Sequence, residues 1–200
     1  MREEKQKLQG KDYITGGIFS LLCMVAMLIA AIMNMSGYTA PFYPVIAAFL
    51  IGILYVIVVC KVSKPGIIFV FSVIPCIYFF TSGLLEGIIG AIGTLIYAML
   101  AELIIHKEFQ NKKKIILSGI IYTMYTSTIG IAESFIATDT YCDNALEHGI
   151  NAMIVEQMRT FYHVKPLWLI IIVTTALTTF LGILIGIRIM NKHLKKAGMM

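Results

Sequence analysis

The sequence predicts an all-α integral membrane protein of six transmembrane helices, with an extracellular amphipathic segment between the fifth and the sixth. Three observations carry this prediction: 58% of the 200 residues are hydrophobic, only 14% are charged, and the mean hydropathy is +0.85. A soluble domain of this size cannot hide so much apolar surface in its own core, whereas lipid can cover it. We therefore expect one membrane domain over residues 1–200.

The apolar runs have spanning length, because a helix that crosses the hydrocarbon needs about 20 residues. They predict helices over about residues 12–34, 42–60, 66–80, 84–105, 115–136 and 166–190. The 66–80 helix is the shortest, and Pro75 inside it removes one backbone donor and should kink it. The 12–34 helix follows a basic segment, as the core of a signal peptide does. It has no A-x-A-type cleavage site, so we expect it to remain in the mature protein.

Basic residues predict the orientation. An even number of helices puts both termini on one side, and fourteen of the sixteen Lys and Arg fall on that side, with Arg159 and Lys165 on the other. Basic loops stay in the cytoplasm, so we expect both termini to be cytoplasmic in a multi-pass protein of the cell membrane. The net charge of +5 then reflects the orientation of the chain in the membrane. We expect the protein to interact with the lipid bilayer and not with nucleic acid. The fourteen are Arg2, Lys5, Lys7, Lys11, Lys61, Lys64, Lys107, Lys112, Lys113, Lys114, Arg188, Lys192, Lys195 and Lys196.

The longest polar stretch, about residues 137–165, lies outside in this topology. Its apolar residues recur at steps of three to five, which indicates an amphipathic helix across the outer mouth. Long segments of this kind are often lids, and a plain solvent-exposed connection is the alternative. The recurring residues are Ala145, Ile150, Met153, Ile154, Met158 and Phe161.

Ionisable groups at membrane depth are few, so each is a functional candidate. Glu86 and Glu133 lie toward the outer side and are candidate ligand-binding carboxylates, while Glu102 is interpreted as structural. For Glu86 the alternative is stabilisation of a helix N-terminus. Outer aromatic residues suit a small, partly planar solute, although many belong to the interfacial belt. The predicted substrate-binding residues are Tyr38, Tyr43, Glu86, Tyr125, Glu133 and Trp168.

Small residues form stripes that let helices approach closely. The stripes in the 84–105 and 166–190 helices are expected to pack within the chain. Gly16 and Ser20 in the 12–34 helix could equally face a partner subunit and are the predicted docking residues.

Enzyme signatures are absent from the sequence: H-E-x-x-H, G-x-S-x-G, the Walker A motif and a helix-opening G-x-G-x-x-G all fail to appear. The four cysteines have neither disulfide nor metal-ligand spacing. We therefore predict no enzymatic activity, no metal site and no cofactor. Without a nucleotide-binding motif, the chain cannot power transport alone.

Several segments carry a resemblance to a known family. They are residues 11–19 (KDYITGGIF), 61–66 (KVSKPG), 101–104 (AELI), the Lys112–Lys114 loop and the basic tail 192–198 (KHLKKAG). With them the sequence resembles the Trep-Strep family, which is grouped with the substrate-binding S components of energy-coupling-factor (ECF) transporters.

The resemblance implies a six-helix subunit that captures a vitamin or other micronutrient from outside. It also implies partners: a transmembrane energy-coupling subunit and two ATPase subunits. Two other functions stay open, an accessory or immunity protein associated with an ABC transporter and, less favoured, a polytopic membrane enzyme.

Overall fold

The computed structural model describes residues 7–80 and 84–196, and every regular element within them is helical. The long helices are α1 (Gly10–Ala30), α2 (Tyr43–Val62), α3 (Ile67–Phe80), α4 (Leu84–Ile105), α5 (Lys112–Thr123) and α9 (Lys165–Lys196). Three short helices, α6 (Ala132–Ile136), α7 (Thr138–Glu147) and α8 (Ala152–Tyr162), lie between α5 and α9. The 3₁₀ turns are η1 (Ala31–Met35), η2 (Ala40–Phe42) and η3 (Met124–Thr126).

The helix α2 is the centre of the bundle. It packs most extensively against α9 and also contacts α1, α3 and α5. Its large apolar side chains are covered by these neighbours, with Ile51, Tyr55 and Val59 fully buried. The outer helices α1, α3, α4 and α9 instead expose many large apolar residues, such as Ile18, Ile92 and Val173. Water does not tolerate such a surface, so these faces are the ones that lipid covers.

Four segments are long and apolar enough to cross a membrane: Gly10–Met35, Ala40–Val62, Gly87–Ile105 and Lys165–Lys192. The prediction of six spans is therefore not confirmed. The helix α3 has 14 residues and α5 has 12, both short of the roughly 20 that a span requires. The predicted limits of the other helices agree with the structure to within six residues, the largest difference being the end of α9 at Lys196.

Pro75 lies inside α3, as the sequence indicates. One turn of α3 is supported from a neighbouring helix: the Ile74 amide donates to Ser20 Oγ of α1 at 3.0 Å. A hydroxyl on the next helix thus satisfies a donor beside the proline, which is how a helix keeps a proline at membrane depth.

Glycines let α2 and α9 approach closely. A β-carbon on Gly52 would lie 2.9 Å from the Thr179 carbonyl oxygen, and one on Gly182 would overlap the Phe49 carbonyl oxygen. The small residues of the 84–105 helix likewise pack within the chain, since Gly87 and Gly90 lie against Phe79 of α3. Both expectations for these two stripes are confirmed.

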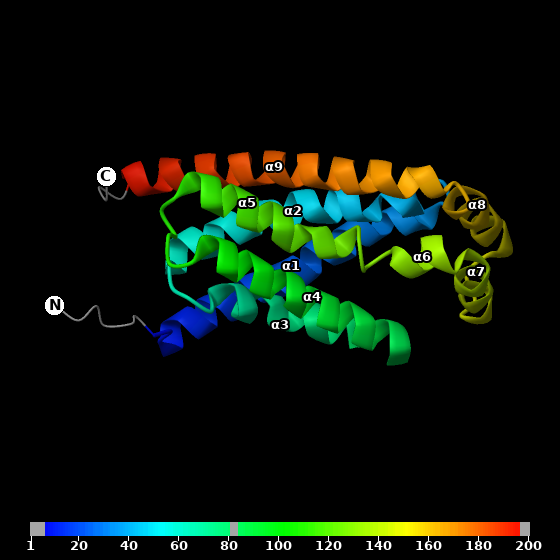
Figure 1. The fold of residues 1–200 in the computed structure, drawn as a ribbon, viewed down its shortest axis with the longest axis horizontal. Helices are drawn as coiled ribbons and strands as arrows, with labels where there is room; N and C mark the ends of the chain where they lie inside the picture. The colour runs from blue at the N-terminus through cyan, green and yellow to red at the C-terminus, as the bar shows by residue number, and fades with distance from the viewer. Residues whose placement is uncertain (1–6, 81–83, 197–200) are drawn as a thin grey trace.

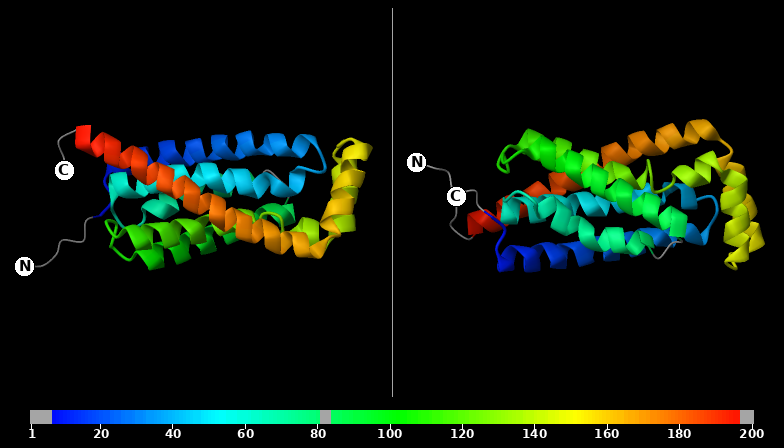
Figure 2. Two further views of the ribbon diagram at one scale, coloured as in Figure 1. Left: turned by 90° about the horizontal axis from the view of Figure 1, so that it is seen from above. Right: turned by 60° about the horizontal axis from the view of Figure 1, so that its bottom comes forward.

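The two ends of the bundle differ (Figure 1; Figure 2). Helix α1 begins and α9 ends at one end, together with the α2–α3 turn and the α4–α5 loop, where Lys residues gather. We call this the basic end. At the opposite end α7 and α8 form a hairpin that lies across the tips of the long helices, as both views of Figure 2 show. We call it the outer hairpin.

Candidate functional site

The fifth predicted helix is interrupted. A continuous helix over 115–136 was expected, and that expectation is wrong: α5 ends at Thr123, η3 follows, and α6 begins only at Ala132. The interruption coincides with the run Tyr125–Gly130, rich in hydroxyls. Thr126 Oγ1 donates to the Thr123 carbonyl at 2.8 Å, and Thr128 Oγ1 donates to the Met124 carbonyl at 2.7 Å. Such local bonds compete with the helical pattern, and Gly130 lowers the helix propensity further.

The first residues of the interruption are buried in the protein, whereas Gly130 near its end is exposed. Thr126 and Ser127 are 1% and 0% exposed. The Trp168 indole N–H of α9 donates to the Ser127 carbonyl at 2.7 Å, so an oxygen that a regular helix would satisfy is held by a side chain. Non-helical backbone at membrane depth is tolerated where it is buried in protein or lines a cavity, and in transporters it commonly marks the binding site.

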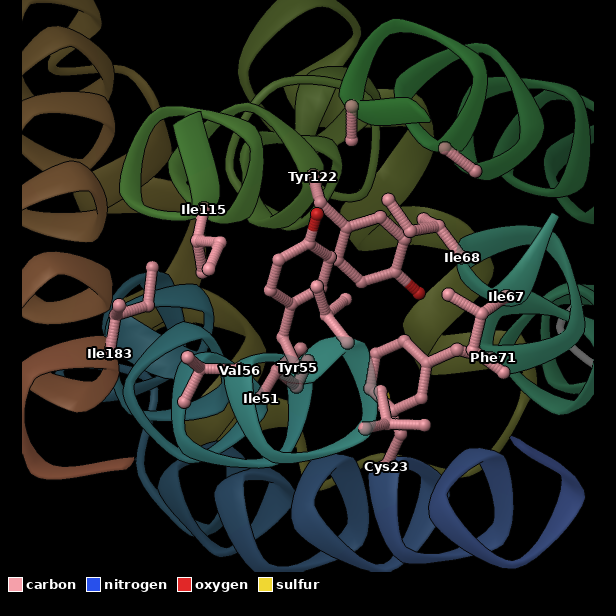
Figure 3. Close-up of a cluster of buried hydrophobic side chains, with 14 of the residues drawn as sticks. Cys23, Ile51, Tyr55, Val56, Ile67, Ile68, Phe71, Ile115, Tyr122 and Ile183 are labelled. Carbon is pink, nitrogen blue, oxygen red and sulfur yellow. The ribbon is translucent and has the colours of Figure 1, made fainter. Parts of the chain in front are cut away.

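Toward the basic end, buried aromatic rings from α2, α3 and α5 fill the bundle (Figure 3). Tyr55 and Tyr122 stack with ring centroids 5.3 Å apart, and Phe71 lies against both rings. The Tyr55 hydroxyl donates to Ser118 Oγ at 2.9 Å. Tyr125 extends the cluster toward the interruption, with its ring 5.5 Å from that of Tyr122. These rings form a packed aromatic core, which lies between the interruption and the basic end.

The sequence did not indicate Tyr55 and Phe71 as members of this cluster. Both lie in uniformly apolar runs, where the sequence has no periodicity to show which face is inward. Tyr125, predicted from the sequence as a substrate-binding residue, belongs to this cluster.

The six predicted substrate-binding residues do not form one site. Tyr125 is buried in the aromatic core, and Tyr43 packs partly buried against the same core. Trp168 lies at the interruption, stacked on Phe135 with ring centroids 5.7 Å apart. The other three are dispersed: Tyr38 is 52% exposed, Glu133 is partly buried in α6, and Glu86 belongs to α4 with its side chain outside the described residues.

The residues were chosen by helix depth, and depth does not fix which way a side chain faces. Tyr38 precedes α2 and packs on the outer hairpin. Its ring meets Phe161 of α8 edge-on, with centroids 5.4 Å apart.

The outer hairpin was expected as one amphipathic helix over part of 137–165. The structure has two helices, α7 and α8, separated at Gly149, whose φ of +81° suits glycine. Their apolar faces form a second buried cluster with Ala40 and Ile171. Gly37 of the α1–α2 loop lies against α8, where a β-carbon would overlap the Ile154 carbonyl, and its amide donates to Gln157 Oε1 at 3.2 Å.

Arg159 ties the two helices of the hairpin together. Its guanidinium bonds Asp139 at 2.5 Å and Asp143 at 2.7 Å, both on α7. The hydrogen bond from Arg159 holds the pKa of Asp139 below its usual value. His163 Nε2 approaches the same carboxylate at 3.3 Å. The hairpin is therefore a folded cap over the outer end, joined to the bundle by the α1–α2 loop.

The predicted docking residues lie at a helix contact within the chain. Gly16 and Ser20 are buried. A β-carbon on Gly16 would lie 2.6 Å from Val70 Cγ1 of α3, and Ser20 bonds Ile74 of the same helix. The expectation that this stripe is open to a partner is corrected, because α3 already occupies it.

Three of the segments that carry the family resemblance meet at the basic end. Asp12 of α1 pairs with Lys64 of the α2–α3 turn at 2.7 Å. On the other side of that turn, Glu102 of α4 accepts from the Gly66 amide at 2.6 Å. Gly66 has φ +91°, which only glycine adopts readily. The two carboxylates therefore fasten the turn between α1 and α4, and the structural interpretation of Glu102 agrees with this contact.

Among the described residues no group of three or more His, Cys, Asp or Glu is placed to hold a metal ion. A bundle with four apolar spanning helices and lipid-facing surfaces defines an integral membrane protein.

The family follows from comparison. The chain belongs to the family described as hypothetical bacterial integral membrane protein (Trep_Strep), whose sequence profile matches residues 10–196. No curated protein and no solved structure matches the chain.

Proposed function

We propose that this chain is the substrate-binding membrane subunit, or S component, of an ECF-type importer. It would capture a vitamin or other micronutrient from outside and deliver it through a partner module, made of a transmembrane coupling subunit and two ATPases. The observation that carries the proposal is the interruption between α5 and α6, a 3₁₀ turn and irregular backbone whose first residues, Thr126 and Ser127, are buried in the protein. Interrupted helices of this kind are used by transporters to present backbone and hydroxyl groups to a solute.

The outer hairpin supports the same function. It covers the end of the bundle nearest the interruption, and its buried cluster is shared with Ile131 of the interruption and Ile171 of α9, so a movement of the hairpin would be felt there. Its ties to the bundle include two long-range hydrogen bonds, from the Gly37 amide to Gln157 Oε1 and from Lys165 Nζ of α9 to Thr138 Oγ1 of α7, and the apolar packing around Ala40. A cap of this construction can open and close by breaking few bonds, as solute gates do.

Orientation completes the proposal. The basic end would face the cytoplasm, because Lys- and Arg-rich loops are retained there, and the outer hairpin would face the exterior. Solute would then reach the interruption from outside. The sequence has no nucleotide-binding motif, so energy must come from a partner. Since α3 fills the Gly16–Ser20 stripe, that partner would dock on another surface.

Affinity purification from the native membrane tests the proposal. We expect a second integral membrane protein and two ATPases to accompany the tagged chain, and a small molecule to be released when the purified protein is denatured. Mass spectrometry identifies both. Association with an ATPase module but no retained small molecule would favour the accessory role, and absence of both would refute the proposal.

A further inference from the structure

One buried hydroxyl close to the interruption lacks a partner. Thr175 of α9 is 0% exposed, and its Oγ1 has no hydrogen-bond partner among the residues that the structure describes. Neighbouring threonines bond back to their own helix: Thr174 Oγ1 donates to the Ile170 carbonyl at 2.8 Å, and Thr179 Oγ1 to the Thr175 carbonyl at 2.8 Å. Buried hydroxyls are nearly always bonded, so this one requires an explanation.

The position of Thr175 follows from the contacts on either side of it along α9. One turn toward the basic end, Thr179 Oγ1 lies 2.7 Å from Thr123 Oγ1, at the last residue of α5. Two turns toward the outer end, Trp168 donates to the Ser127 carbonyl, just after η3. Residues 168, 175 and 179 share one face of a helix. Thr175 therefore faces the interruption between these two contacts.

The surroundings are polar but uncharged. No position in 123–127 or 168–179 carries an ionisable acid or base other than the Tyr125 phenol. The groups available there are the hydroxyls of Thr123, Thr126 and Thr175, and the Trp168 indole contacts the same segment through the Ser127 carbonyl. An ion placed among them would be buried without a counter-charge, which is costly, whereas a neutral hydrogen-bonding group would be satisfied.

We propose that the Thr175 hydroxyl binds the hydrogen-bonding edge of an uncharged small molecule that occupies the interruption. This inference rests on the proposed function and narrows its substrate to neutral, polar compounds. The Thr175 hydroxyl can donate one hydrogen bond and accept up to two. The predicted carboxylates Glu86 and Glu133 then have no direct part in recognition.

Four variants test this: Thr175→Val, Thr175→Ser, Thr174→Val and Glu133→Gln. Valine keeps the shape of threonine without the hydroxyl, and serine keeps the hydroxyl. Thr174→Val is the matched control. Thr174 is the residue next to Thr175, and its hydroxyl already donates to a carbonyl of its own helix. Each purified protein is incubated with the dialysable small molecules of bacterial growth medium and washed. The retained compounds are quantified by mass spectrometry, and thermal unfolding is measured in parallel.

The wild-type chain, Thr174→Val, Thr175→Ser and Glu133→Gln should retain the same neutral compound in similar amounts. Thr175→Val should bind it about three- to tenfold more weakly, as expected for one neutral hydrogen bond, and should unfold at no lower temperature. Equal retention by Thr175→Val would overturn the inference and leave the proposed function standing, as would a retained compound that is charged or that depends on Glu133. If the wild-type chain retains nothing, the proposed function fails as well.

Discussion

The contact between α2 and α9 allows a quantitative test of the fold. Replacing Gly182 with Ala puts a methyl group where the Phe49 carbonyl oxygen of α2 already lies. The obstacle is backbone, so no side-chain rotation relieves it. To reach an ordinary C···O contact of about 3.3 Å, the two helices must separate by roughly 1 Å. Close to this point Thr178 Oγ1 donates to the Val45 carbonyl at 3.0 Å, and separation would strain that bond too.

Overpacking of this kind typically costs about 1–3 kcal/mol. For a chain of 150–250 residues each kcal/mol lowers Tm by about 2–4 °C, so we expect a decrease of about 2–12 °C. Alanine is a better helix former than glycine by about 0.8–1.0 kcal/mol, so the net loss against the wild-type chain is about 0–2 kcal/mol. The decrease of about 2–12 °C is therefore expected relative to a glycine-to-alanine control that creates no overlap. A decrease in Tm relative to such a control therefore reports how closely the backbones of α2 and α9 approach.

The assay is thermal unfolding of the purified protein in detergent, with Gly17→Ala as the matched control. Gly17 lies in α1, and a β-carbon there would meet nothing within 4 Å. Gly17→Ala should be neutral or slightly stabilising. If Gly182→Ala unfolds at the same temperature as Gly17→Ala, α2 and α9 are not packed as described, and the central position of α2 is wrong.

Three further predictions concern other contacts. Ser20→Ala should lower stability by about 1 kcal/mol in thermal unfolding, because the α3 amide beside the proline loses its acceptor; no change would mean that α3 satisfies that amide itself. Arg159→Gln should speed hydrogen exchange in α7 and α8 at pH 7. In the wild-type chain the same loosening should occur only as pH falls below about 3.8, because the folded-state pKa of Asp139 lies under that value and protonation removes the pairing; loosening already at pH 6 would contradict this. In a cysteine-free background, an impermeant thiol reagent applied to intact cells should label cysteine at 147 and not at 110, and the reverse pattern would overturn the proposed orientation.

Local composition was sufficient to predict where most of the long helices lie in the chain. The helices α2, α3 and α4 begin and end within about two residues of the predicted positions. Their limits are set by what is present in the chain itself: apolar length, the αL turn at Ser63 before Pro65, and the basic loops. The same local signals predicted the start of α9 after the polar 137–165 segment.

The residues of the candidate site were harder to predict, because their positions depend on partners distant in sequence. Tyr125 was identified from its depth, yet its neighbours Tyr55 and Phe71 were not, since uniformly apolar helices do not show which face is inward. Thr175 had no distinguishing feature in a run of threonines. Only its burial without a partner sets it apart.

The sequence by itself determined that the chain is a helical membrane protein with most of its basic residues at one end, because hydrophobic length and charge act locally and against the bilayer. The tertiary structure alone decided three other matters. The 115–136 segment breaks where hydroxyls and Trp168 replace helical bonds, α3 occupies the stripe at Gly16, and α7 and α8 fold over the outer end. Each depends on which helix lies opposite, and that is settled by shape and hydrogen bonding between segments far apart in the chain.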